Sequence, residues 1–223
     1  DMHDADSKHP FALRKIAAVP KLFGYNLTKR QENLEALAKD YNLTYSVDKN
    51  KNTGFLDPFL FFKTKQTNYI YNELKDGNSN SKLFDIEFSE GEFIAKEVVR
   101  TSMLHIDLNE TIPVFSLDRE TLIDKVYAIA GFTDINFDEH PDFSKRFHLV
   151  GEHIEDIKSF FTNELIHFFE SNPYYHIESN GNSLLIFSKQ RLASTKEIKA
   201  LLDFGKRLKD VLPNLPVDRQ GKN

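Results

Sequence analysis

Two pairs of strand-like runs joined by tight turns constrain the fold of this chain most strongly. Residues 174–179 and 183–188 flank Asn180-Gly181, and an Asn-Gly pair between two such runs is a strong short-range signal of a β-hairpin. Residues 83–88 and 92–108 flank a Ser-Glu-Gly turn, and their apolar side chains recur with the period of two that is typical of strands. The chain is therefore expected to contain an antiparallel sheet.

The remaining expected elements do not alternate regularly between strand and helix. Capping residues followed by apolar residues at helical spacing predict four helices, over about residues 29–41, 118–131, 154–168 and 194–212. Short runs with a period of two predict further strands over 43–47, 113–117, 134–137 and 145–150, with an acidic turn at 138–141. This order lacks the alternation of a doubly wound sheet. The predicted fold class is α+β, a largely antiparallel sheet with about four packed helices.

The length and composition favour one main domain. With 223 residues, of which 40% are hydrophobic and 20 are Phe, the chain can build a substantial core. We expect a basic N-terminal flank or juxtamembrane arm over 1–28, a single α+β domain over 29–213 and a frayed tail over 214–223. The polar turn at 75–82 is the point at which this domain would be subdivided.

Composition argues against several functional classes. A net charge of −5 gives no reason to expect nucleic-acid binding, which usually requires a basic face. The absence of Cys removes disulfides, a thiolate nucleophile and cysteine zinc ligands. The sequence also lacks a nucleophile elbow, a P-loop and a dinucleotide-binding glycine motif. No apolar run approaches the roughly 20 residues that span a bilayer.

A basic flank stands out in this acidic chain. Between Lys8 and Arg30 there are six Lys or Arg residues and no Asp or Glu. Such a segment is typical of a region at an anionic membrane surface, or of the cytoplasmic side of a transmembrane helix. The alternative is an N-terminal arm docked on the domain with a solvated basic edge. The candidate membrane-facing residues are Arg14, Lys15, Lys21, Lys29 and Arg30.

An acidic, histidine-containing stretch over 138–155 offers the ligand types that a divalent metal prefers. The candidate ligands are Asp138, Asp142, His140, His148 and His153. Their spacing does not place two histidines on one face of a helix, as a zinc-protease motif does. The alternative is a polar turn followed by acids that cap a helix. The sequence predicts no cofactor. The alternative is a divalent metal bound by this stretch.

Spaced motifs along most of the chain resemble a group of uncharacterised bacterial proteins. The motifs lie between about Lys29 and Leu212 and comprise Pro113-Val-Phe-Ser-Leu-Asp-Arg-Glu, Lys125, Gly131, Asp134-Ile-Asn-Phe-Asp, Pro141-Asp-Phe-Ser, Phe147-His-Leu-Val-Gly and Phe160-Phe-Thr. In this group a soluble α+β domain commonly follows N-terminal transmembrane helices. The resemblance implies an architecture and a link to a membrane, and it implies no activity.

These observations together predict a non-enzymatic binding or regulatory domain of a bacterial membrane-associated protein. The expected partner is a membrane surface or an upstream transmembrane segment, with the domain on the cytoplasmic side. A metal-dependent hydrolase built on the 138–155 cluster is the first alternative. A cytoplasmic interaction module without membrane contact is the second, and its protein partner is not indicated by the sequence.

Overall fold

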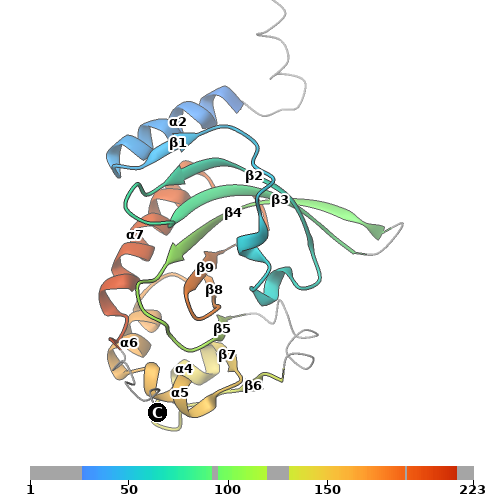
Figure 1. Cartoon of the computed structure of the whole chain (residues 1–223). Coiled ribbons are helices and arrows are strands. Elements are labelled where there is room, and N and C mark those ends of the chain that lie inside the picture. The colour runs from blue at the N-terminus through green and yellow to red at the C-terminus, as the bar shows by residue number, and fades with distance from the viewer. Residues whose placement is uncertain (1–26, 92–94, 120–130, 189, 215–223) are drawn as a thin grey trace, which may run out of the picture.

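The computed structural model describes residues 27–91, 95–119, 131–188 and 190–214 (Figure 1). One antiparallel sheet of nine strands organises them, in the order β1-β2-β3-β4-β9-β8-β5-β7-β6. The strands are β1 (Thr44–Ser46), β2 (Gln66–Lys75), β3 (Lys82–Glu90), β4 (Glu97–Asp107), β5 (Phe115–Asp118), β6 (Thr133–Asp134), β7 (His148–Gly151), β8 (His176–Ser179) and β9 (Ser183–Phe187). The α-helices are α2 (Leu27–Asp40), α4 (Pro141–Arg146), α5 (Ile154–Phe160), α6 (Asn163–Ser171) and α7 (Thr195–Val211), with short 3-10 helices η2 (Gly54–Leu56) and η3 (Leu60–Phe62). The α+β prediction is confirmed.

Both faces of the sheet are covered, because successive side chains of a strand point to opposite faces. On β3, Leu83 joins the larger core, to which the helices α2 and α4 to α7 contribute. Its neighbour Phe84 joins a second, Phe-rich core formed with η2 and η3 on the other face. In Figure 1, α2 and α7 lie on one side of the β1–β4 strands, and η2 and η3 lie on the other. The Phe side chains of the chain are therefore divided between two cores, one on each face of the sheet.

Most of the predicted elements are confirmed. The two hairpins form as β3–β4 and β8–β9, with Gly181 in the left-handed region at φ 100°. Ser194 and Glu197 form the predicted capping box at the start of α7. The polar turn after Lys75 joins β2 to β3, which are neighbours in the same sheet. The helix predicted over 118–131 lies largely outside the described residues.

The region from Asp134 to Phe161 differs from its prediction in two ways. The segment expected to be a turn followed by a strand from 145 contains the helix α4, because Pro141 occupies the first helical turn, where a missing N–H costs nothing. The single helix expected over 154–168 is two helices. Thr162 has extended backbone angles, and its side chain accepts a hydrogen bond from the N–H of Leu165, so it ends the α5 region and caps α6.

Gly151 allows α5 to pack closely on the sheet. A Cβ atom there would lie 2.1 Å from Cδ1 of Ile157 and 3.0 Å from the carbonyl oxygen of Val114. We expect Gly151→Ala to lower the free energy of unfolding, measured by urea denaturation, by about 1–3 kcal/mol, the usual cost of overpacking. Gly77→Ala is the control, since a Cβ there meets nothing within 4 Å. Equal effects of the two substitutions would contradict this packing argument.

Candidate functional site

The metal-ligand candidates lie near the end of the sheet that carries β6 and β7. His140 Nε2 is 2.8 Å from Asn163 Oδ1, and His148 forms a pair with Asp134. His153 immediately precedes α5. Asp142 lies in the first turn of α4, and Asp138 lies in the turn before it. Among the residues that the structure describes, no group of three or more His, Asp or Glu side chains could hold a metal ion.

Of the membrane-facing candidates, Arg30 has a place inside the fold. Its Nε and Nη2 donate hydrogen bonds to the two carboxylate oxygens of Asp85, at 3.0 and 2.8 Å. Its Nη1 donates to the carbonyl oxygen of Ala193 at 2.6 Å. The side chains of Arg30 and Asp85 are only 11% and 1% exposed. Arg30 therefore links α2 to the sheet and to the segment before α7. Because its guanidinium is buried and hydrogen-bonded, it is poorly placed to contact a membrane.

The carboxylate of Asp85 has two further donors. Ser102 Oγ donates to it at 2.6 Å and Asn72 Nδ2 at 2.9 Å. Asn72 in turn accepts a hydrogen bond from the hydroxyl of Tyr45 at 2.9 Å. A buried charge is costly unless it is paired and hydrogen-bonded, and this network meets both conditions. The remaining flank candidates divide into Lys29, which is exposed on α2, and Arg14, Lys15 and Lys21, which lie outside the described residues.

A second buried polar cluster joins β5, β8 and η3. His176 lies between two carboxylates, with Nδ1 2.6 Å from Asp118 and Nε2 3.0 Å from Glu178. Glu178 also accepts a hydrogen bond from the backbone N–H of Phe61 at 3.0 Å. Burial by itself lowers the pKa of His176, but the hydrogen bonds to Asp118 and Glu178 outweigh it and raise that pKa to about 9. The imidazole is therefore charged at neutral pH, and the cluster holds the η3 segment on the sheet.

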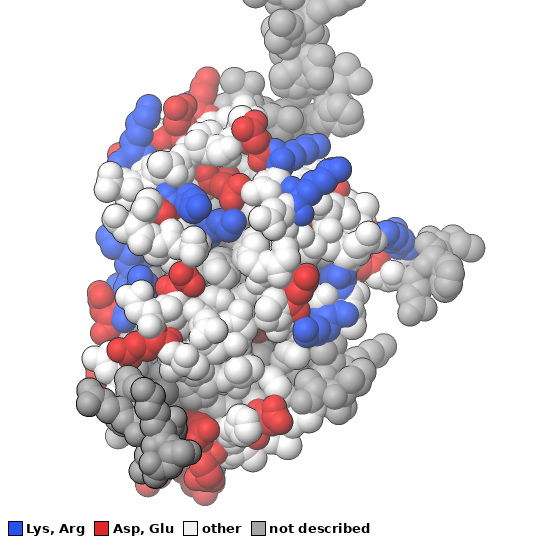
Figure 2. Space-filling view, viewed as in Figure 1, with Lys and Arg blue, Asp and Glu red and all other residues white. Residues whose placement is uncertain are grey.

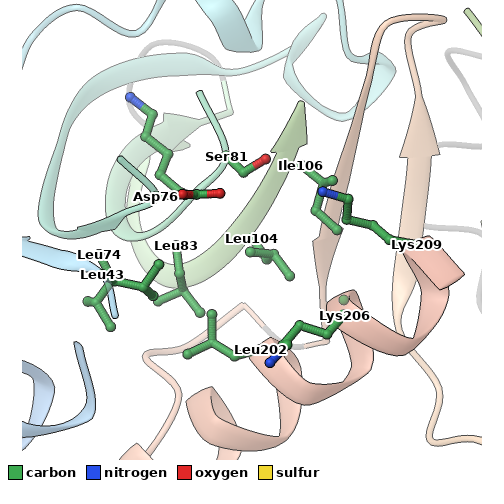
Figure 3. A pocket seen from close by; sticks show the side chains of 12 residues that line it. Leu43, Leu74, Asp76, Ser81, Leu83, Leu104, Ile106, Leu202, Lys206 and Lys209 are labelled. Atoms are coloured by element: carbon green, nitrogen blue, oxygen red, sulfur yellow. The ribbon is translucent and has the colours of Figure 1, made fainter. Parts of the chain in front are cut away.

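A mainly apolar hollow lies between α7 and the ends of β2, β3 and β4 (Figure 3). We call it the α7 hollow. Its volume is about 120 Å³ and its walls are mainly apolar. The apolar lining comprises Leu43, Leu74, Leu83, Leu104, Ile106, Leu202 and Gly205, and the polar lining comprises Asp76, Ser81, Lys82, Lys206 and Lys209.

The lysines of α7 give the rim of the hollow a positive side. Lys206 and Lys209 are exposed and lie one helical turn apart, so they share a face of α7 (Figure 3). Within the described residues, neither ammonium group forms an ion pair with a carboxylate. Asp76 is the acid on the rim, and its carboxylate accepts hydrogen bonds from the N–H of Asn78 and the hydroxyl of Ser79. These bonds lower the pKa of Asp76, and Lys209 adds to the effect.

Charge is distributed unevenly over the visible face of the molecule. Figure 2 shows Lys and Arg side chains, mixed with acids, over the part of this face that carries α2, α7 and β2–β4. Over the part that carries α4, α5 and β6, the charged side chains visible on this face are acidic. The chain enters the described domain at Leu27, beside the more basic part (Figure 1).

Sequence reasoning missed the Arg30 network, the His176 cluster and the α7 hollow. A period of two places Asp85 on the same strand face as Leu83, and His176 on the same face as Glu178, so buried polar groups could have been suspected. Their partners lie far away in sequence, and no local pattern identifies them.

The helices that the structure describes include none long and apolar enough to cross a bilayer.

Comparisons with known proteins show a likeness in fold. No family model matches the chain, and no curated protein matches it in sequence. Its structure is similar to the crystal structure of the mycobacterial trehalose monomycolate transport factor A, TtfA, with a TM-score of 0.52 and 10% sequence identity. The match covers 83% of this chain and 97% of that chain. At this identity the likeness concerns the fold, which the two chains share over most of their length.

Proposed function

We propose that this chain is a non-enzymatic binding or regulatory domain that works at a membrane surface. The observation that carries the proposal is the basic flank, with five Lys or Arg and no Asp or Glu from Lys8 to Lys29, besides the buried Arg30, in a chain of net charge −5. Basic residues near an anionic leaflet each contribute about 1 kcal/mol of attraction. The similarity in fold to TtfA, a transport factor, supports a binding role. The same excess of Lys and Arg favours the cytoplasmic side.

The proposal is supported by the way the last residue of the flank is held. The flank ends in α2, and Arg30 in the first turn of α2 is locked to Asp85 of β3. Arg30, the last residue of the flank, is therefore fixed to the sheet by a charge-assisted pair.

The metal-dependent hydrolase is the weaker interpretation. Two of its three histidines already have polar partners, His140 with Asn163 and His148 with Asp134. The described residues do not gather its candidate ligands around one point. We therefore propose a binding role and no reaction.

Vesicle binding tests the proposal. Replacing Arg14, Lys15 and Lys21 by Gln is expected to weaken binding to vesicles that contain phosphatidylserine. At about 1 kcal/mol for each charge, the partition coefficient should fall about 100-fold at low salt. Arg30 is left intact, because it is buried in the pair with Asp85 and its removal is expected to destabilise the domain. Co-sedimentation of the full chain with vesicles provides the measurement.

The matched control removes the same charge from the domain itself. Lys158, Lys196 and Lys199 are exposed on α5 and α7, and their replacement by Gln is expected to leave vesicle binding within about threefold of the wild type. If the two triple variants bind equally well, the attraction is a property of the net charge, and the role assigned to the flank is wrong.

A further inference from the structure

We infer that the α7 hollow binds the aliphatic end of a small anionic amphiphile, a straight carbon chain that carries a carboxylate. The inference rests on the binding role proposed above but not on contact with a membrane. A failure of vesicle binding and a failure of this ligand would therefore be separate results.

The lining of the hollow favours a flexible aliphatic group. Its apolar side chains are leucines and one isoleucine, and no aromatic ring lines it, although the chain has 20 Phe. An apolar cavity of about 150 Å³ holds one benzene molecule, which has six carbons. The 120 Å³ of the hollow therefore suits about five carbons. Such a volume accepts the end of a chain and excludes a bulky ring system.

The shape of the hollow depends on a close approach of α7 to β4. A Cβ atom on Gly205 would lie 2.5 Å from Cδ2 of Leu104 and 3.2 Å from Cδ1 of Ile106. Gly205 thus allows the helix to lie directly on the strand, and Leu104 and Ile106 together with Leu202 form one side of the hollow. The lining is fixed by buried side chains of the main core, so the hollow is held open by the fold.

The rim supplies the preference for a negative head group. Lys206 and Lys209 lie on the same helix face, both line the hollow, and neither has an ion-pair partner among the described carboxylates. Lys82 also lines it but is paired with Glu73 at 3.1 Å. Asp76 is held by its own turn through Asn78 and Ser79, so it offers no competing salt bridge that must first be broken. Lys206 Nζ lies 5.8 Å from the centre of the Tyr41 ring, and Lys209 acts electrostatically on Asp76. An amine head group would therefore meet two ammonium groups that are not held in ion pairs, whereas a carboxylate would complement them.

Chain length gives a sharp test, because each buried methylene strengthens binding about fourfold. The isotope-labelled full chain is titrated with butanoate, hexanoate and octanoate, and amide shifts of Leu104, Leu202 and Gly205 report the hollow. Hexanoate, with five carbons beyond its carboxylate and two methylenes more than butanoate, should bind about 15-fold more tightly than butanoate. Octanoate should gain less than about threefold more, since its last carbons find no room. An affinity that keeps rising to octanoate, or shifts that centre elsewhere, would overturn the assignment.

Charge variants test the rim. The double substitution Lys206→Gln with Lys209→Gln should weaken hexanoate binding about tenfold and leave hexanol unchanged. The control, Lys196→Gln with Lys199→Gln, removes the same charge from the same helix and should leave hexanoate binding unchanged. Hexylammonium should bind less tightly than hexanoate to the wild type. Equal binding of hexylammonium and hexanoate, or equal effects of the two double substitutions, would refute the role of the rim.

Discussion

Arg30→Ala is expected to lower the free energy of unfolding by about 3–5 kcal/mol, the cost of removing one partner from a buried ion pair. The substitution leaves the carboxylate of Asp85, which is 1% exposed, with only Ser102 and Asn72 as donors. It also removes the hydrogen bond to the carbonyl of Ala193, so α2 loses its link to the segment before α7. Urea denaturation followed by circular dichroism measures the change.

A pair between β3 and β4 with an exposed arginine provides the control. Arg100 pairs with Glu87 at 2.7 Å, but its side chain is 56% exposed, so Arg100→Ala should cost no more than about 1 kcal/mol. Replacing Arg30 by Met together with Asp85 by Leu should recover most of the loss, because no buried charge then remains unpaired. If Arg30→Ala proves no more damaging than Arg100→Ala, the flank is not anchored to the sheet in the way described.

The His176 cluster predicts a loss of stability in mildly alkaline solution. The folded state raises the pKa of His176 from 6.5 to about 9, so the charged imidazole favours folding. This contribution is fully present below pH 6.5 and is lost as the pH rises through about 9. At 1.36 kcal/mol for each pKa unit, the loss amounts to about 3 kcal/mol.

Substitution of His176 separates this effect from the titration of other groups. His176→Gln cannot carry the charge, so it should be less stable at neutral pH and should not lose stability further through this window. His167→Gln is the control, since His167 is exposed on α6. Free energies of unfolding at a series of pH values from 6 to 9.5 provide the comparison. Parallel pH profiles for wild type and His176→Gln would show that His176 is not the group responsible.

Local signals predicted most of the fold. The β8–β9 hairpin follows from Asn180-Gly181 alone, and α7 follows from its capping box and apolar stripe, because each signal lies within a few neighbouring residues. The errors arose where the same local pattern is compatible with two different structures. Pro141 suggested a break but begins α4, and the apolar spacing of the α5–α6 region continues across Thr162 although the backbone turns there.

The candidate site could not be predicted in the same way. Arg30 and Asp85 are 55 residues apart, and the lining of the α7 hollow extends from Leu43 to Lys209. Such groups meet only when the sheet has formed and α2 and α7 have packed on it. The sequence could indicate inward-facing polar residues, such as Asp85 and Glu178, but not the partners that satisfy them.

The measurement that tests the central proposal most directly is vesicle binding by the unmodified full chain at low and high salt. The proposal predicts binding to vesicles containing phosphatidylserine, no binding to pure phosphatidylcholine, and a steep loss of binding as salt screens the basic flank. Equal binding to both kinds of vesicle, or no binding to either at low salt, would contradict a role at an anionic membrane surface.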